Sequence, residues 1–390
     1  MPSDLSDGSK IIIKIEGFSH ILSHAAKAFF YATCINPLDE SNGNVKKIIG
    51  RIKKSVYFAS SKPIFFRQKE NMLCIQLKNN DPYFCLAAEE YLLKNFSEDI
   101  FMLWQSDNAV VVGKHQNALA EINYPFVYRN NITVARRISG GGTVFHDAGN
   151  VNFSYIKNVS SPAEISFKLF TEPVVKALAK LDVKATTSGR NDLLVEGKKI
   201  SGNAEHIFKN RVLHHGTLLF NSNLLTLGQS IKVIPGKYQG KAVQSNRSVV
   251  TNISPFLKKK WSVSDFSSFL LEVQLENEDN SVYELNEKDN RAIQKMVDEK
   301  FSTWDWNYGY SPKYSFHNEF LFEGKKLKVE LQVEKGRIVS SDCSGDFFTG
   351  NELEILNESL VGEKHFYSDI RAKLEEIRLG IPDELVFGFF

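Results

Sequence analysis

From Met72 onward, short apolar runs alternate with helix-like patterns and turn residues. The runs that predict strands are Leu73–Leu77, Phe101–Trp104, Ala109–Val112, Ile132–Ala135, Val151–Ile156 and Val212–Phe220. Ser106-Asp107-Asn108 is typical of a hairpin turn joining the second and third of these runs. The run from Val151 to Ile156 alternates like a strand with only one buried face.

Three segments have helical spacing. Asp81-Pro82 begins the first helix, because aspartate can cap a helix and proline suits its first position, and this helix is expected to end near Asn95. The other two are Ala163–Leu181 and Ser264–Lys300, the latter interrupted by a polar stretch. Since helices and strands do not alternate strictly, we expect an α+β fold with a mixed, largely antiparallel sheet flanked by helices.

The chain is expected to contain an extension, a catalytic domain and an accessory domain. Aromatic residues gather between Thr303 and Pro312, and a strand, a turn, a strand and a helix follow. We therefore predict a catalytic domain over 72–305 and a small α+β accessory C-terminal domain over 306–390. Residues 1–71 are predicted to be an extension that activity does not need, with Met72 as the functional start.

Charge and cysteine content narrow the class of protein. The 390 residues carry a net charge of +2, so no nucleic-acid or membrane surface is expected over the whole chain. Four cysteines without a CxxC pair favour a reduced, cytosol-like compartment, and we expect a cytoplasmic monomer, or a mitochondrial one in a eukaryote. The extension holds a basic cluster, interpreted as a solvated face or loose arm rather than a targeting element: Lys46, Lys47, Arg51, Lys53 and Lys54.

The densest candidate site is the segment from Arg136 to Asn152. Two arginines precede three consecutive glycines, Gly140 to Gly142. A glycine turn lets backbone amides approach an anion closely, and the arginines suit a phosphate or carboxylate. The alternative is a flexible linker, although linkers are usually Gly/Ser-rich on both flanks and lack paired arginines. The spacing matches neither a Walker P-loop nor a dinucleotide GxGxxG fingerprint.

A second candidate lies around Glu196-Gly197, which predicts a two-residue hairpin turn. Such a turn gives the cross-strand pairs Val195–Lys198, Leu194–Lys199, Leu193–Ile200 and Asp192–Ser201. Directly paired residues share a face of the sheet, so Lys199 meets Asp192 and Lys198 points to the other face. The alternative is an ordinary surface ion pair that contributes little.

Taken together, these residues resemble the lipoate–protein ligase family, within the biotin and lipoate protein ligase superfamily. The resemblance covers residues 72–390, and its landmarks occur in order: Leu86–Glu90, Gly113–Asn117, Arg137–His146, Gly189–Asp192, Lys199–Gly202, His214–Thr217, Ser245–Asn252 and Trp304–Gly309. Three positions depart from the usual family pattern, and they bear on substrate preference: Cys85, Ile138 and Asn203.

The resemblance implies roles for individual residues. It implies Lys199 as the catalytic residue. The residues it implies for binding ATP and the adenylate are Arg137, Gly142, Thr143, Val144, Phe145, Asp192 and Lys199. Those it implies for binding lipoate are Gly141, His146 and Lys199, and Asp192 is implied for Mg²⁺.

The activity implied by the resemblance is ATP-dependent conversion of lipoate to lipoyl-AMP, followed by transfer to a lysine. The acceptors would be the lipoyl domains of 2-oxoacid dehydrogenase E2 subunits and glycine cleavage H protein. One alternative is a transferase that takes lipoyl or octanoyl from a preformed acyl-AMP or an acyl carrier. No cysteine lies between Cys85 and Cys343, which argues against a covalent acyl-cysteine route. Another alternative is a non-catalytic module that binds a carrier domain; intact Arg137, Asp192 and Lys199 argue against it.

Overall fold

The computed structural model describes residues 71–161, 165–189, 191–246 and 248–390. The fold below is that of the unit Lys69–Phe390. The predicted extension, with its basic cluster, lies outside the described residues except for Asn71. Domain boundaries after residues 71 and 305 stay predictions.

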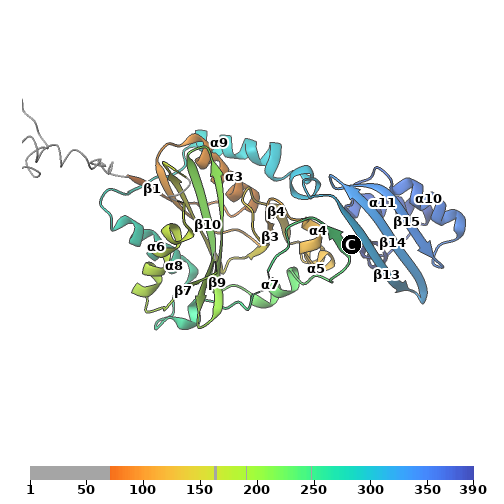
Figure 1. Cartoon of the computed structure of the whole chain (residues 1–390), viewed down its shortest axis with the longest axis horizontal. Helices are drawn as coiled ribbons and strands as arrows, with labels where there is room; N and C mark the ends of the chain where they lie inside the picture. Colours follow the sequence, from red (N-terminus) through yellow and green to blue (C-terminus); the bar gives the residue numbers. More distant parts are fainter. Residues whose placement is uncertain (1–70, 162–164, 190, 247) are drawn as a thin grey trace, which may run out of the picture. The chain divides into compact units, whose positions relative to one another are not determined.

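A large mixed sheet forms the centre of the molecule (Figure 1). Its strands run in the order β12-β1-β2-β6-β10-β9-β8-β7. In that order they span Ser281–Val282, Met72–Gln76, Asp99–Trp104, Asn150–Asn158, Arg211–Leu219, Lys198–Phe208, Asp192–Val195 and Thr186–Ser188. Strand β1 pairs in parallel with both of its neighbours, whereas the remaining pairs are antiparallel. The predicted α+β class and largely antiparallel sheet are confirmed.

A smaller sheet, β4-β3-β5, carries the glycine loop. It consists of β4 (Thr133–Arg136), β3 (Ala109–Val112) and β5 (Val144–His146). The hairpin predicted between Phe101–Trp104 and Ala109–Val112 is therefore wrong, because β2 and β3 belong to different sheets. Both strands are buried throughout, and neither pairs with the other. Strand β2 pairs with β6 of the large sheet, and β3 pairs with β5 of the smaller sheet.

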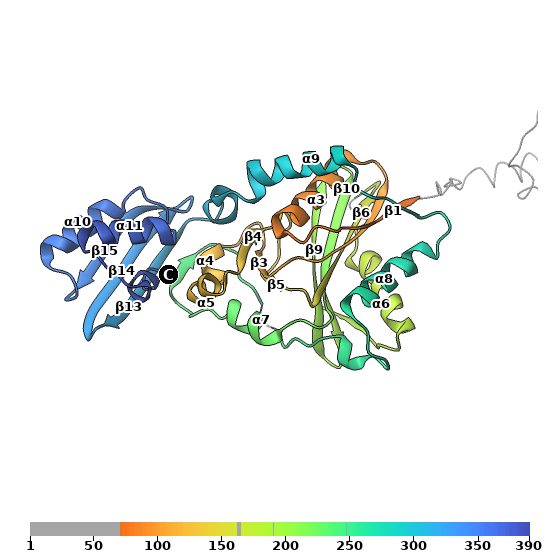
Figure 2. The ribbon, with the colours of Figure 1, turned by 180° about the vertical axis from the view of Figure 1, so that it is seen from behind.

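Helices cover both faces of the large sheet (Figures 1 and 2). On one face lie α3 (Pro82–Asn95) and α9 (Glu287–Met296); on the other lie α6 (Phe167–Lys180) and α8 (Val263–Leu275). The predicted start of the first helix is confirmed, since the Asp81 side chain accepts from the amide of Phe84 at 2.8 Å.

Three sequence expectations need correction because of these layers. Strand β6 is buried on both faces, with Phe153 under α6 and α8 and Ile156 under α3, so it is not half-buried. The helix expected from Ala163 begins at Phe167, where Ser166 caps it. The segment expected to be one interrupted helix up to Lys300 is α8, the short strand β12, α9 and a π turn.

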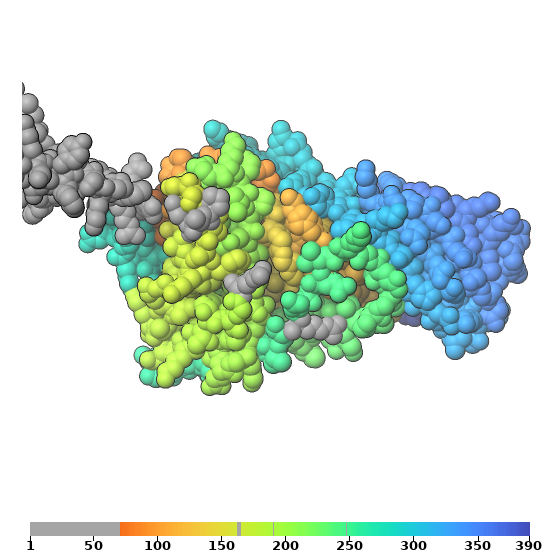
Figure 3. Space-filling view, in the orientation of Figure 1, coloured from red at the N-terminus to blue at the C-terminus, as the bar shows by residue number. Residues whose placement is uncertain are grey.

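The C-terminal part is a four-stranded antiparallel sheet with helices packed on it, as predicted for an α+β unit. The strands are β11 (Tyr238–Gly240), β13 (Tyr314–Phe322), β14 (Lys325–Glu334) and β15 (Arg337–Gly345). Its helices are α10 (Gly350–Leu360), α11 (Tyr367–Ile377) and α12 (Asp383–Phe387). Strand β11 comes from much earlier in the chain and pairs with β13, so a green segment reaches the blue C-terminal part in Figure 3.

Shorter helical elements connect these layers. They are α4 (Ala118–Glu121), α5 (Tyr124–Arg129), α7 (Leu224–Ser230), η2 (Ser254–Phe256), η3 (Val297–Phe301) and η4 (Asp305–Gly309). No helix among the described residues is long and apolar enough to cross a membrane.

One buried arginine ties the glycine-loop sheet to the start of the C-terminal part. Arg136 is fully buried, and its guanidinium donates only to neutral oxygens at 2.7 to 3.1 Å. These acceptors are the carbonyls of Gly113, Lys114, Gln116, Trp306 and Asn307, and the hydroxyl of Ser311. Burial lowers the pKa of Arg136 to about 10, so it stays charged at neutral pH.

Candidate active site

The three-glycine loop is folded around the guanidinium of Arg137. Its Nη2 donates to the carbonyls of Gly140 and Gly142 at 2.6 Å each, and its Nη1 donates to the carbonyl of Val111 at 3.1 Å. Gly141 has φ +86°, a conformation that side-chain-bearing residues rarely adopt. Burial lowers the pKa of Arg137 to about 10. In this structure Arg137 therefore shapes the loop, because its guanidinium donates to backbone carbonyls of the protein.

A chain of buried polar groups holds Arg137 from behind. Its Nε donates to the Ser139 hydroxyl at 3.0 Å, and this hydroxyl lies 2.6 Å from His215 Nε2. His215 Nδ1 in turn lies 2.8 Å from a carboxylate oxygen of Glu89 on α3. This series of hydrogen bonds runs from the Glu89 carboxylate to the Arg137 guanidinium. It links α3, strand β10 and the glycine loop. Sequence reasoning gave Glu89 no role; its signal was a carboxylate on the apolar face of the predicted helix.

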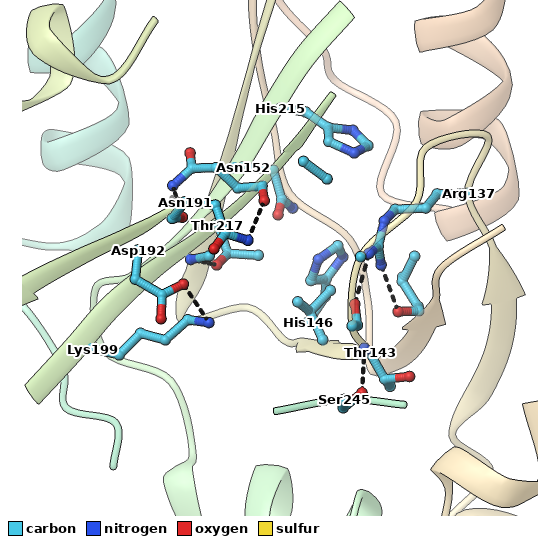
Figure 4. A pocket seen from close by; sticks show the side chains of 18 of the residues that line it. Arg137, Thr143, His146, Asn152, Asn191, Asp192, Lys199, His215, Thr217 and Ser245 are labelled. Carbon is cyan, nitrogen blue, oxygen red and sulfur yellow. Dashed lines mark hydrogen bonds and ion pairs between the residues drawn. The ribbon is translucent and has the colours of Figure 1, made fainter. Parts of the chain in front are cut away.

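The hairpin that carries Lys199 forms largely as expected. Glu196 and Gly197 have φ of 49° and 75°, which suits a tight hairpin turn, and Lys199 pairs with Leu194. Lys199 Nζ lies 2.9 Å from Asp192 Oδ1, whereas Lys198 is exposed. Figure 4 shows this ion pair between Lys199 and Asp192. The predicted meeting of Lys199 and Asp192, and the exclusion of Lys198, are confirmed.

The predicted register beyond Lys199 is wrong by one residue. A bulge shifts the pairing, so Leu193 lies opposite Ser201 and Asp192 opposite Gly202. The extra residue, Ile200, enters the core beneath α6 and α8. A side chain at Gly202 would come within 3.0 Å of Lys199 Nζ, so the glycine leaves room for the ammonium beside Asp192.

Two adjoining cavities open beside this ion pair. The first, of about 260 Å³, is lined by Leu86, Trp104, Arg137, Gly141, His146, Asn152 and Asp192, among others. The second, of about 740 Å³, is lined by Phe145, Leu219, Leu227, Ile231, Tyr238 and Val250, among others. Lys199, Thr143, Val144 and Thr217 line both. Every site residue that the sequence predicts lines one cavity or both, and Lys199 lies at their boundary.

His146, one of two histidines that line the first cavity, is neutral. His146 is buried, its ring meets Trp104 edge-on at 5.4 Å between centroids, and its Nδ1 lies 3.2 Å from the Ser106 hydroxyl. Burial first, and then the charges of Arg137 and His215, lower the pKa of His146 to about 3. His146 therefore adds no charge to the wall of the first cavity at neutral pH.

This pKa predicts how stability depends on pH. Unfolded His146 takes up a proton below about pH 6.5, whereas the folded state does not until about pH 3, so the free energy of unfolding falls as pH drops between these values. We expect His146→Gln to flatten this dependence by up to about 1.4 kcal/mol per pH unit. Urea unfolding of wild type and His146→Gln at pH 7, 6 and 5 measures the free energy of unfolding at each pH. If this free energy falls equally with pH in both proteins, His146 does not have the lowered pKa.

The segment around Ser245 closes over the loop. Ser245 Oγ accepts from the amide of Thr143 at 2.8 Å and from Gln116 Nε2 at 3.1 Å, and it donates to the carboxylate of Glu121. The Thr143 amide, predicted to bind phosphate, is thus bonded to Ser245 in this structure (Figure 4). Sequence reasoning placed Ser245 in a family landmark but did not identify this contact.

Comparison with known proteins agrees with the fold and the site. Residues 81–274 match the family model of the lipoyl protein ligase A/B catalytic domain, and residues 311–382 match that of the bacterial lipoate protein ligase C-terminus. The chain belongs to the lipoate–protein ligase family, as its resemblance predicted.

Individual relatives match along most of the chain. It is 40% identical over 301 residues to lipoate–protein ligase 1 of Staphylococcus aureus, covering 77% of this chain and 92% of that protein. It is also 40% identical over 314 residues to the lipoate-protein ligase LplJ of Bacillus subtilis, covering 79% and 95%.

Solved structures share the fold. The lipoate protein ligase of Thermoplasma acidophilum, studied together with its E2 lipoyl domain, has a TM-score of 0.54 and 25% identity, covering 62% of this chain and 97% of that one. LipL1 of P. falciparum, in complex with lipoate, has a TM-score of 0.53 and 25% identity, covering 81% and 97%.

Proposed function

We propose that this ligase activates free lipoate with ATP and transfers the lipoyl group to a lysine of a lipoyl domain. The observation that carries the proposal is the ammonium of Lys199 at the boundary of two cavities, held by Asp192 at 2.9 Å. A cation at that point can contact an acyl oxygen on one side and a phosphate on the other.

The two cavities suit the two halves of an acyl-adenylate. The first is the smaller, and Leu86, Trp104 and neutral His146 form an uncharged part of its wall that fits a hydrocarbon chain. Arg137, Asp192 and Lys199 give the rest of this wall its charge. The second is larger, and apolar side chains such as Leu227 and Ile231 offer surfaces for a planar base. We assign the acyl chain to the first cavity and the base and ribose to the second. The phosphate lies at their boundary, within reach of Lys199 and Thr143, which line both cavities, and of Asp192 in the first.

The chemistry follows from this placement. In the first step a carboxylate oxygen of lipoate attacks the α-phosphorus of ATP, and pyrophosphate leaves. In the second step the neutral ε-amine of the acceptor lysine attacks the acyl carbon, AMP leaves with the bonding electron pair, and the proton that the nitrogen loses passes to solvent. The ammonium of Lys199 stabilises the negative charge that grows on the phosphate in one step and on the carbonyl oxygen in the other.

A magnesium ion fits this site only together with the phosphates of ATP. Among the residues that the structure describes, no group of three or more metal-binding side chains occurs. Asp192, partly exposed beside Lys199, supplies one carboxylate, and Mg²⁺ is commonly bound by one or two carboxylates plus substrate phosphates. When bound, the ion neutralises charge on the phosphates. We propose Asp192 as its protein ligand.

The transferase alternative gains no support from the cysteines. Among the described residues, Cys74, Cys85 and Cys343 are buried, and none of them lines either cavity. Burial also raises the pKa of Cys85 well above its usual range, so its thiol stays protonated. The described part of the chain therefore offers no cysteine at this site for a covalent acyl-cysteine step.

Mass spectrometry of an apo lipoyl domain from a 2-oxoacid dehydrogenase E2 subunit tests the function and its metal requirement. With the full chain, ATP, Mg²⁺ and lipoate, we expect lipoylation of one lysine. Omitting ATP, or chelating Mg²⁺ with EDTA, should abolish the product. Preformed lipoyl-AMP should restore it without ATP. If the lipoyl domain is modified when lipoyl-AMP is supplied but not when ATP and lipoate are supplied, the ligase function is rejected and the transferase alternative remains. Parallel reactions with octanoate and with glycine cleavage H protein identify the preferred acid and acceptor.

A further inference from the structure

Asn152 lies at the centre of a row of side chains that lines the first cavity. In the large sheet it pairs directly with Trp104 on β2 and with Thr217 on β10. Directly paired residues share a face, so the three side chains point the same way, and all three line the cavity. Figure 4 shows Asn152 and Thr217 in the same wall as the Lys199–Asp192 pair.

Within this row the side-chain amide of Asn152 keeps an uncommitted donor. Its Oδ1 accepts from Asn150 Nδ2 at 2.9 Å, whereas its Nδ2 is buried and has no hydrogen-bond partner in the described part of the chain. The two residues paired with it in the sheet are satisfied: Trp104 Nε1 donates to Ser154 at 2.9 Å, and Thr217 Oγ1 accepts from an amide at 3.2 Å. Asn150 Oδ1 is the other buried atom here without a partner in the described part of the chain, but it is an acceptor and Asn150 does not line the cavity. A buried donor without a partner is costly, so its presence in a cavity wall indicates that a ligand supplies the acceptor.

We propose that Asn152 Nδ2 donates a hydrogen bond to the acyl oxygen of the bound acid and of its adenylate. This inference rests on the proposed function. Asn152 lies between Trp104, which lines only the first cavity, and Thr217, which lines both, so it faces the acyl side close to the boundary at which Lys199 lies. A hydrocarbon chain offers an amide no acceptor, which leaves the carboxyl end of the acid as its partner.

Asn152 and Lys199 then form a site with two donors for one oxygen. As the acceptor amine attacks the acyl carbon, the carbonyl double bond opens and its electron pair moves to this oxygen. The Lys199 ammonium contributes charge and the Asn152 amide contributes direction, because its partner Asn150 fixes the plane of the group. Asn152 is therefore assigned as a catalytic residue that touches the substrate.

Two adenylate analogues that differ at this oxygen test the proposal. A lipoyl sulfamate of adenosine retains the acyl carbonyl, whereas the AMP ester of lipoyl alcohol lacks it. In calorimetric titrations we expect Asn152→Ala to weaken binding of the carbonyl analogue by about tenfold or more, and that of the alkyl ester by less than about twofold. Asn152→Asp keeps the side-chain volume but replaces the donor with a carboxylate. It should therefore weaken binding of the carbonyl analogue even more than Asn152→Ala does.

Asn158→Ala is the matched control, because Asn158 lies on the same strand at its far, exposed end. It should bind both analogues like wild type. Equal weakening of both analogues in Asn152→Ala, unchanged binding of both, or retained binding of the carbonyl analogue in Asn152→Asp would each overturn the inference. If the alanine variant does not fold, the isosteric aspartate variant decides alone. Wild-type protein that binds neither analogue would instead reject the proposed function.

Discussion

Lys199→Ala is expected to lower the rate of lipoyl transfer by about two orders of magnitude or more, the scale of losing one donor to a developing anion. Both half-reactions should suffer, because Lys199 lines both cavities. Pyrophosphate exchange measures adenylate formation, and transfer from preformed lipoyl-AMP measures the second step. A loss in only one of them would confine Lys199 to one side of the boundary.

Lys198→Ala is the matched control for this experiment. Lys198 is the neighbouring lysine on the same strand, but it is exposed and lines neither cavity. It should retain activity near that of wild type. The fold should survive in both variants, because the partly exposed Lys199–Asp192 pair contributes about 1 kcal/mol or less to stability. Near-wild-type activity of Lys199→Ala would reject its catalytic role.

The largest expected effect on stability comes from Arg136→Leu. Five carbonyls and one hydroxyl would lose the guanidinium as a donor, and leucine offers none in return. The Gly113 carbonyl still accepts from the Gln116 amide and the Ser311 hydroxyl from the Ala118 amide, so the loss falls mainly on the other four carbonyls. Removing the buried charge recovers part of its desolvation cost, but the unpaired oxygens outweigh it. We expect the free energy of unfolding to fall by about 3 kcal/mol or more, measured in urea.

Arg129→Ala provides the comparison. Arg129 also connects the two parts of the fold, through an ion pair of 2.8 Å with Glu384, but its side chain is 52% exposed. Its loss should cost about 1 kcal/mol or less. If both variants lose the same stability, the buried network around Arg136 does not have the importance assigned to it.

Local sequence signals predicted the features that depend on a few neighbouring residues. Asp81-Pro82 specifies a helix start through its own cap, and Glu196-Gly197 specifies a turn that brings Lys199 to Asp192. The glycine loop is equally local, since Arg137 bonds to carbonyls three and five residues away. For these reasons the predicted site residues come together.

Features that depend on distant segments could not be predicted in this way. The turn between β2 and β3 is compatible with a hairpin, and only the burial of both strands among other partners shows that they separate. The bulge at Ile200 depends on the core beneath it, not on the turn. The donor of Asn152 is recognised only when the partners of every neighbour are known.

Strand β11 means that order along the chain and grouping in space do not coincide. The segment that leaves α7 enters the C-terminal sheet at Tyr238–Gly240 and returns at Ser245 to bond with the glycine loop. A protein cut after residue 305 would keep this segment but lose the strand against which it lies. Such a fragment would carry an exposed strand edge directly beside the second cavity, which Tyr238 of β11 lines. The catalytic and accessory parts are thus interlocked pieces, and exchanging C-terminal parts between relatives requires exchanging β11 as well.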